Sequence, residues 1–150
     1  MQIVERRSQK AADGDPAGER RRRVDPSETI ERGGGQILLF TSAAGARPTP
    51  GAPLYSSARA AANMLVRNVA DEVVGRNVQI NAIGTNFMDF PEFLRATGGT
   101  DPEVRKQLEA AVPMRRLGTV EECAAMCAIF LDGTSRFTTG QFLPFAGGWA

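Results

Sequence analysis

The pattern of hydrophobic and polar positions becomes regular from Ile30 onward. Two short apolar runs, residues 36–42 (QILLFTS) and 78–83 (VQINAI), have the length of strands, and the first has the look of a strand buried on both faces. Between them, small and apolar residues recur at helical spacing over residues 55–75, and Gly75 is expected to cap that helix. The pattern therefore predicts a strand, a helix and a second strand.

The remainder of the pattern predicts three further helices and a closing strand. The helices are expected over residues 91–96, 101–111 and 123–131, and the strand over residues 141–145. Thr119 and Glu122 have the spacing of a capping box, which would start the last helix. Strands that alternate with helices indicate right-handed crossovers and a parallel sheet. The predicted fold class is α/β, with one domain over residues 30–150.

Residues 1–29 differ from the rest of the chain in composition. They contain four successive arginines at 20–23 and few apolar residues besides Ile3, Val4 and Val24. Such a segment buries too little apolar surface to offset its chain entropy, so it is predicted to be a disordered Arg-rich leader. A tail that binds nucleic acid or a partner is one interpretation, but the interspersed acids favour a solvated segment. The formal net charge of +1 likewise indicates neither a nucleic acid nor an anionic membrane as a partner.

Composition also limits the chemistry that is available. The chain has no histidine, which excludes Ser-His-Asp and Cys-His catalysis and argues against a metal site of the zinc type. Cys123 and Cys127 lie four residues apart in a predicted helix and are expected to be buried, reduced thiols of a cytoplasmic protein. With neither an apolar stretch of bilayer length nor a secretory signal in view, no membrane association is expected. Proton transfer is left to Tyr, Lys, Asp, Glu or Cys.

Three residues form the strongest candidate for catalysis. Ser42 ends the first apolar run, Tyr55 follows thirteen residues later, and Arg59 comes four residues after Tyr55. Side chains four apart lie on one helix face, so the guanidinium is expected close to the phenol. A fixed positive charge favours the phenolate and lowers the pKa of a tyrosine, while a serine hydroxyl can donate to a substrate oxygen. The spacing predicts Tyr55 as the acid or base, Arg59 as its activator and Ser42 as the oxygen anchor.

Four short motifs accompany these residues: NVQINAI at 77–83, PMRRLGT at 113–119, TGQF at 139–142 and GGW at 147–149. With Ser42 and Tyr55, they resemble the C-terminal half of the short-chain dehydrogenase/reductase superfamily. This resemblance covers residues 30–150 and implies a Rossmann-like doubly wound parallel sheet, here as three strands with flanking helices. Members of the superfamily are commonly tetramers, so a homo-oligomer through the helix that carries Tyr55 is expected, with Trp149 at a subunit contact.

Two departures from the superfamily pattern point to one of its branches. Arg59 stands where the superfamily has the lysine of Y-x-x-x-K, and the loop that usually contains Pro-Gly contains Thr85, Asn86, Phe87 and Met88. Both features are similar to the halohydrin dehalogenases, in which the corresponding loop cradles a halide. The resemblance implies conversion of a haloalcohol into an epoxide and a halide, and the reverse opening by small anions, without a redox cofactor. The alternative for Phe87 and Met88 is core packing under the loop.

Two other functions remain open. One is an NAD(P)-dependent short-chain dehydrogenase/reductase oxidoreductase, although the glycines at 33–35 precede the Ser42 strand instead of forming a phosphate-binding turn. The other is a truncated, non-catalytic fragment that needs a partner, because the superfamily's first βαβ units have no counterpart in residues 1–29. In that case one edge of the strand at 36–42 is expected to be unpaired and prone to association.

Overall fold

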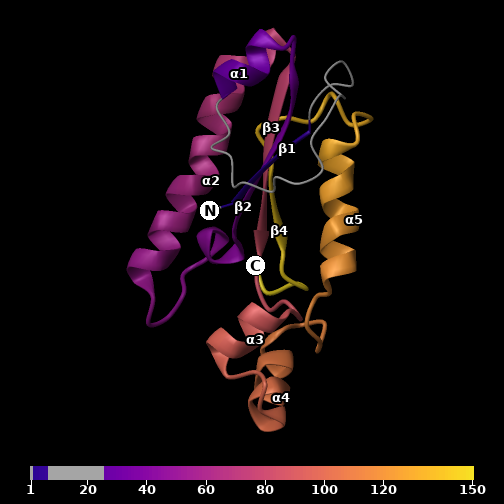
Figure 1. The fold of residues 1–150 in the computed structure, drawn as a ribbon. Helices are drawn as coiled ribbons and strands as arrows, with labels where there is room; N and C mark the ends of the chain where they lie inside the picture. The colour runs from indigo at the N-terminus through magenta and orange to yellow at the C-terminus, as the bar shows by residue number, and fades with distance from the viewer. Residues whose placement is uncertain (1, 7–25) are drawn as a thin grey trace.

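A four-stranded sheet forms the centre of the structure, a computed structural model that describes residues 2–6 and 26–150 (Figure 1). The strands lie in the order β1 (Gln2–Arg6), β2 (Gly35–Ser42), β3 (Val78–Thr85) and β4 (Phe142–Phe145). β2, β3 and β4 are parallel to one another, whereas β1 pairs with β2 in the antiparallel direction. The parallel part confirms the predicted three strands with flanking helices.

Two long helices cover the two faces of this sheet. α2 (Pro53–Val73) lies on one face and α5 (Val120–Leu131) on the other (Figure 1). Each follows a strand and leads back to the amino end of the next one, which is the crossover that parallel strands require. The short elements are α1 (Pro26–Glu31), the 3₁₀ turns η2 (Ala43–Ala46) and η3 (Val74–Arg76), α3 (Pro91–Thr97) and α4 (Pro102–Ala111).

The core has two apolar layers because successive side chains of a strand point to opposite faces of a sheet. Ile37 and Leu39 of β2 pack toward α2, whereas Leu38 between them packs toward α5. The α2 layer also contains Val66, Ala70, Val73, Val78, Ile80 and Ala82, and the α5 layer contains Ile83, Met88, Cys123, Cys127 and Phe130. The prediction that β2 is buried on both faces is confirmed.

Local capping explains where the helices begin and end. α5 begins at Val120, earlier than expected, because Thr119 is its N-cap and forms the predicted capping box with Glu122. The end of α2 also differs from the expectation. Gly75 lies inside the 3₁₀ turn η3, and Asn77, with a φ of 59°, takes the left-handed position that ends this turn.

Within the segment predicted to be a disordered leader, residues 1–29, the structure describes strand β1 and the start of α1, which corrects the expectation at those positions, whereas residues 7–25 lie outside the described residues. Gln2–Arg6 pairs along β2, with Gln2 opposite Phe40 and Arg6 opposite Gln36, and α1 begins at Pro26. Main-chain pairing does not require the apolar side chains whose scarcity indicated disorder. The edge of β2 that was expected to be unpaired is therefore covered by β1. The four arginines at 20–23 lie outside the described residues.

Cys123 and Cys127 are free and buried on α5, as predicted. Burial raises the pKa of the Cys127 thiol to about 12, and it also raises that of Cys123, so both groups stay protonated at neutral pH. Among the described residues, no helix combines the length and the apolar character needed to cross a bilayer.

Asn81 attaches β4 to the sheet from the middle of β3. Its side chain is 1% exposed, its Nδ2 donates to the carbonyl oxygen of Thr138 at 2.9 Å, and its Oδ1 accepts from the N–H of Gln141 at 3.0 Å. The turn before β4 is therefore held by one buried amide that uses both of its ends. This bonding explains an asparagine within an apolar strand.

Replacing Asn81 by alanine should leave the Gln141 N–H and the Thr138 carbonyl without their partner. An unpaired buried polar group costs about 1–3 kcal/mol, so Asn81→Ala should lower the free energy of unfolding by that amount and move the urea midpoint to lower concentration. Asn68→Ala, at an exposed position on α2, is the control and should leave the midpoint unchanged. Equal midpoints for both variants would contradict the role given to Asn81.

Candidate active site

Two of the predicted site residues, Ser42 and Thr85, lie at the carboxyl edge of the parallel strands. Ser42 is the last residue of β2 and lies opposite Thr85, the last residue of β3, and Thr85 in turn lies opposite Phe145 of β4. Ligands of open α/β sheets bind outside the carboxyl ends of the strands. The structure thus brings Ser42 and the start of the 85–88 loop to one edge, as the predicted roles require.

Ser42 is buried at this edge, and its conformation is fixed by a cap. Its Oγ accepts the N–H of Ala44 at 3.2 Å, which makes Ser42 the N-cap of η2. A hydroxyl has two lone pairs and one proton, so this bond occupies one lone pair and leaves the O–H free to be directed at a ligand. The side chain is thus held in place and can still donate.

Tyr55 and Arg59 lie on one face of α2, as their spacing predicts. The guanidinium carbon of Arg59 is 4.8 Å from the centroid of the Tyr55 ring, a cation–π contact over the ring face. The Tyr55 side chain is 47% exposed, so its phenol can exchange protons with solvent. The Arg59 cation is therefore paired with the face of the Tyr55 ring.

Two buried donors on α2 have no acceptor among the described residues: Nε of Arg59 and Nδ2 of Asn63. The other end of the Asn63 amide, Oδ1, accepts from Oγ1 of Thr41 at 2.7 Å. Arg59 and Asn63 are four residues apart, so both donors belong to the helix face that meets the end of β2. Buried donors without partners are uncommon in folded proteins, and they suit a place that receives an oxygen or an anion.

Gly45 lets the η2 turn approach α2 closely at these residues. A Cβ on Gly45 would lie 2.5 Å from Nδ2 of Asn63, 2.7 Å from the carbonyl carbon of Arg59 and 2.8 Å from the nitrogen of Ala60. Two of these three atoms are backbone and cannot move aside independently. Only glycine fits here, and it sets the distance between the Ser42 turn and the helix that carries Tyr55.

The 85–88 loop uses part of its backbone to hold itself in place. Asn86 donates its N–H to the carbonyl of Phe145 at 3.3 Å, Gly118 donates to the carbonyl of Phe87 at 2.9 Å, and Asp89 donates to the carbonyl of Gly118 at 2.8 Å. Among the described residues no acceptor pairs with the N–H groups of Phe87 and Met88, so these two are the candidate donors for a ligand. Successive N–H groups in a turn can form an anion-binding concavity.

The two apolar side chains of this loop have different surroundings. Met88 is 4% exposed and packs in the α5 layer of the core, so the core-packing alternative holds for its side chain. Phe87 instead makes edge-on ring contacts with Phe93 and Trp149, at centroid distances of 6.3 and 5.5 Å. Met88 can therefore serve an anion only through its backbone, whereas the Phe87 ring stays at the edge of the sheet.

A cavity of about 230 Å³ lies on the α5 side of this loop. Asn86 and Phe87 form one wall of it, and the lining does not include Ser42, Tyr55 or Arg59. The rest of the lining consists of Val112, Met114, Arg116, Gly118, Glu122, Phe145, Ala146 and Gly147. The PMRRLGT motif marks part of this wall. The position of this motif in the sequence gives no sign that residues 113–119 fold back onto the loop after β3.

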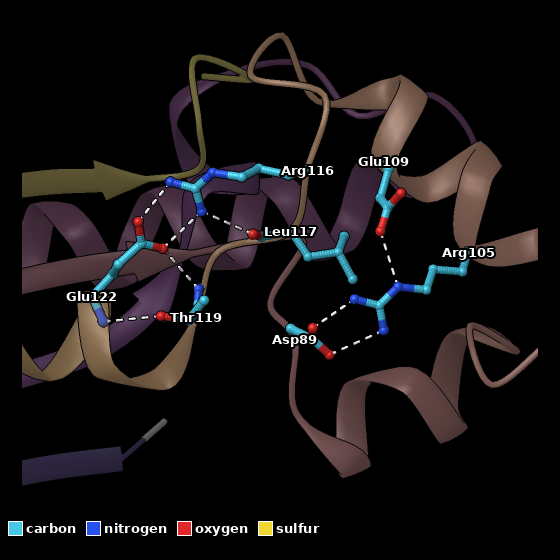
Figure 2. Close-up of polar contacts among 7 residues, drawn as sticks. All are labelled: Asp89, Arg105, Glu109, Arg116, Leu117, Thr119 and Glu122. Atoms are coloured by element: carbon cyan, nitrogen blue, oxygen red, sulfur yellow. Dashed lines mark hydrogen bonds and ion pairs between the residues drawn. The ribbon is translucent and has the colours of Figure 1, made fainter. Parts of the chain in front are cut away.

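Two charged clusters brace the segments around the cavity (Figure 2). Arg116 binds both carboxylate oxygens of Glu122, at 2.8 and 2.6 Å, and Glu122 also accepts the N–H of Thr119 at 3.0 Å. The Arg116 bonds, and then the Thr119 bond, lower the pKa of Glu122 to about 2. On the other side Arg105 joins Asp89 to Glu109, which raises the pKa of Arg105 (Figure 2).

The described residues do not form a dinucleotide cradle around the predicted site. The glycines at 33–35 lie at the start of β2, at the opposite end of that strand from Ser42. A Cβ on Gly34 would lie 2.4 Å from the carbonyl oxygen of Asn77, so a glycine is needed here for the chain to pack closely against the turn before β3. Arg59 stands where a lysine would be required for the ribose.

Comparison with known proteins establishes the family. The family profile described as enoyl-(acyl carrier protein) reductase matches residues 22–150. This chain belongs to the short-chain dehydrogenase/reductase family. The match confirms the resemblance that the motifs indicated, and it covers most of this chain.

Individual relatives include enzymes of different chemistry. A 2,5-dichloro-2,5-cyclohexadiene-1,4-diol dehydrogenase of Sphingobium indicum is 31% identical over 82% of this chain and 48% of its own length. A solved structure titled "Dehalogenation enzyme" is 32% identical, with a TM-score of 0.73 over 83% of this chain and 51% of that one. NAD+-bound xylitol dehydrogenase is 31% identical, with a TM-score of 0.71 over 82% of this chain and 52% of that one. The chain thus spans about half the length of the relatives that it matches.

Replacing Gly45 by alanine should separate the Ser42 turn from α2. Forcing extra atoms into a packed site typically costs about 1–3 kcal/mol, so Gly45→Ala should lower the urea midpoint of unfolding accordingly. Gly75→Ala is the matched control, because a Cβ on Gly75 meets nothing within 4 Å. A Gly45→Ala variant as stable as Gly75→Ala would show that η2 does not pack on α2 in this way.

Replacing Glu122 by glutamine should make stability less dependent on acid pH. Because the folded pKa of Glu122 is lowered from 4.5 to about 2, its stabilising effect is complete above pH 4.5 and is lost as pH falls through 2. Glu122→Gln should therefore be less stable than the wild type at pH 7, with the difference shrinking in acid. Urea midpoints at pH 7 and pH 3 measure this, with Glu121→Gln as control. A difference that does not change with pH would contradict the pairing with Arg116.

Proposed function

We propose that the site catalyses halohydrin dehalogenation, the conversion of a vicinal haloalcohol into an epoxide and a halide. The observation that carries this proposal is the pairing of Arg59 with the Tyr55 ring at 4.8 Å, on the helix that packs against the turn after Ser42. An arginine beside the phenol and a loop with free N–H donors suit acid–base and anion chemistry. Similarity to the structure titled "Dehalogenation enzyme" supports the same function.

The reaction needs one proton transfer and one internal displacement. Tyr55, as phenolate, removes the proton of the substrate hydroxyl, and the Ser42 O–H donates a hydrogen bond to the oxygen that becomes an alkoxide. That oxygen attacks the neighbouring carbon, so a C–O bond forms while the C–halogen bond breaks and the halide leaves with its electron pair. Arg59 supplies a positive charge that no proton transfer removes in the working pH range. The half-exposed Tyr55 then returns the proton to solvent.

The departing halide is assigned to the loop formed by Thr85, Asn86, Phe87 and Met88. The N–H groups of Phe87 and Met88 are the donors available to it, since those of Asn86 and Asp89 are already bonded. The Phe87 ring, packed edge-on against Phe93 and Trp149, adds an apolar group next to these donors, and a drier surrounding strengthens a hydrogen bond to an anion. In the reverse direction another small anion, such as azide or cyanide, enters here and opens an epoxide that Tyr55 protonates.

An NAD(P)-dependent oxidoreductase is the second candidate. It is favoured by the dehydrogenases among the relatives, one of which is titled as NAD+-bound. Against it stand the arginine at position 59 and the position of the glycines at 33–35. A third candidate is a non-catalytic fragment that acts only with a partner. An assay of halide release without nucleotide, compared with NAD(P)H-dependent reduction of a ketone, separates these candidates.

The expected homo-oligomer and the cytoplasmic location stay predictions. The helix that carries Tyr55 exposes Leu54, Met64 and Leu65, by 86%, 52% and 47%, and such a face supports pairing with a second copy. Free Cys123 and Cys127 support a reducing compartment.

Removal of the Tyr55 hydroxyl should abolish the proposed reaction. General acid–base catalysis typically contributes about 10²–10⁴-fold, so Tyr55→Phe should reduce halide release from 1,3-dichloro-2-propanol by at least that range. Chloride and proton release are followed without nucleotide. Ser42→Ala should also reduce release, whereas Ser57→Ala, at an exposed position beside Tyr55, is the control and should not.

Three results would contradict the proposal in different ways. Halide release that survives in Tyr55→Phe would remove Tyr55 as the base. NAD(P)H-dependent reduction of a ketone, without halide release, would favour the oxidoreductase. Absence of both activities in the chain, with release restored by a version that carries a full N-terminal half, would favour the fragment that needs a partner.

A further inference from the structure

Trp149 connects two loops that are far apart in the sequence. The carbonyl oxygen of Trp149 accepts from a terminal nitrogen of Arg47 at 2.7 Å, and the guanidinium of Arg47 lies 4.7 Å from the centroid of the indole ring. The indole also meets the Phe87 ring edge-on at 5.5 Å. Arg47 follows η2 and Phe87 lies in the loop after β3. The tryptophan therefore joins the segment after Ser42 to the predicted halide loop.

Phe87 has a backbone conformation that needs support. Its φ of 53° lies in the left-handed region, which is unfavourable for a large aromatic residue and is uncommon outside glycine and asparagine. Such conformations persist where neighbouring groups hold them, and they concentrate at functional sites. The Phe87 carbonyl is held by Gly118, and its ring is held by Trp149 and Phe93.

We propose that Trp149 is a positioning residue of the candidate site, which holds Phe87 in its left-handed conformation and so orients the Phe87 and Met88 N–H donors toward the anion. Arg47 fixes the indole from the segment after Ser42, so the oxygen anchor and the anion loop keep a constant separation. This inference rests on the proposed function. It adds Trp149 and Arg47 to the site, neither of which touches the reacting atoms.

Hydrogen exchange tests the positioning without reference to activity. Trp149→Ala should speed exchange of the amides of residues 85–90, while the amides of Ile80 and Ala82 in the core of β3 stay as slow as in the wild type. Phe137→Ala is the matched control, because it truncates an aromatic side chain that is fully exposed. Trp149→Phe keeps a ring for both Phe87 and Arg47 and should restore slow exchange in the loop. Unchanged exchange in Trp149→Ala would overturn the proposal.

Bromide binding tests whether this positioning serves an anion. Bromide, compared with sulfate at equal ionic strength, should protect the 85–90 amides in the wild type, and its half-protecting concentration should rise roughly tenfold in Trp149→Ala. Faster loop exchange with unchanged bromide protection would overturn the proposal and leave a purely structural contact.

The tryptophan also supplies a direct signal, since it is the only one in the chain. Bromide should quench its fluorescence saturably in the wild type and more weakly in Arg47→Met, with Arg136→Met as the unaffected control. Wild-type bromide protection with no halide release would overturn the proposed reaction alone. Halide release with no change of bromide affinity in Trp149→Ala would overturn the role of Trp149 alone.

Discussion

The parallel pairing of β2 with β3 is the constraint on which the candidate site depends, because it sets Ser42 opposite Thr85. Gly84, the residue before Thr85, allows the strands to approach closely at this end. A Cβ at that position would lie 2.8 Å from the carbonyl carbon of Ser42 and 2.6 Å from the Phe142 ring of β4. One glycine therefore sets the spacing of three strands at the edge where the chemistry is proposed.

A second close approach fixes the site from the direction of α2. Gly45 brings the η2 turn against the backbone of Arg59 and Ala60, so the Ser42 cap and the Tyr55 helix cannot drift apart. Nδ2 of Asn63 lies at this contact and Nε of Arg59 is buried on the same helix, and neither atom has an acceptor among the described residues. Rigid packing thus surrounds polar groups that are not internally satisfied, the arrangement expected where a ligand completes the bonding.

Much of the fold could be predicted from the chain because local signals and the sheet agree. The apolar run of β2, the helical spacing of α2 and the capping box of α5 each follow from contacts within a few residues. Strand β1 could not be predicted in this way, since its pairing uses the main chain and its two apolar residues, Ile3 and Val4, are too few to indicate a strand. For the same reason, nothing in the local sequence indicated that β2 would have a partner on that edge.

The candidate site likewise has a part that the sequence could predict and a part that it could not. The sequence by itself determined which residues are candidates and how they are spaced. Tyr55 and Arg59 are four residues apart on a helix and therefore share a face, and Ser42 ends an apolar run that is predicted to be a strand. Only the tertiary structure decided that Met88 turns into the core, that Met114 and Phe145 wall a cavity, and that Trp149 contacts both Arg47 and Phe87. These contacts join residues tens of positions apart, and such distances are set by how the sheet and helices pack, which no local pattern encodes.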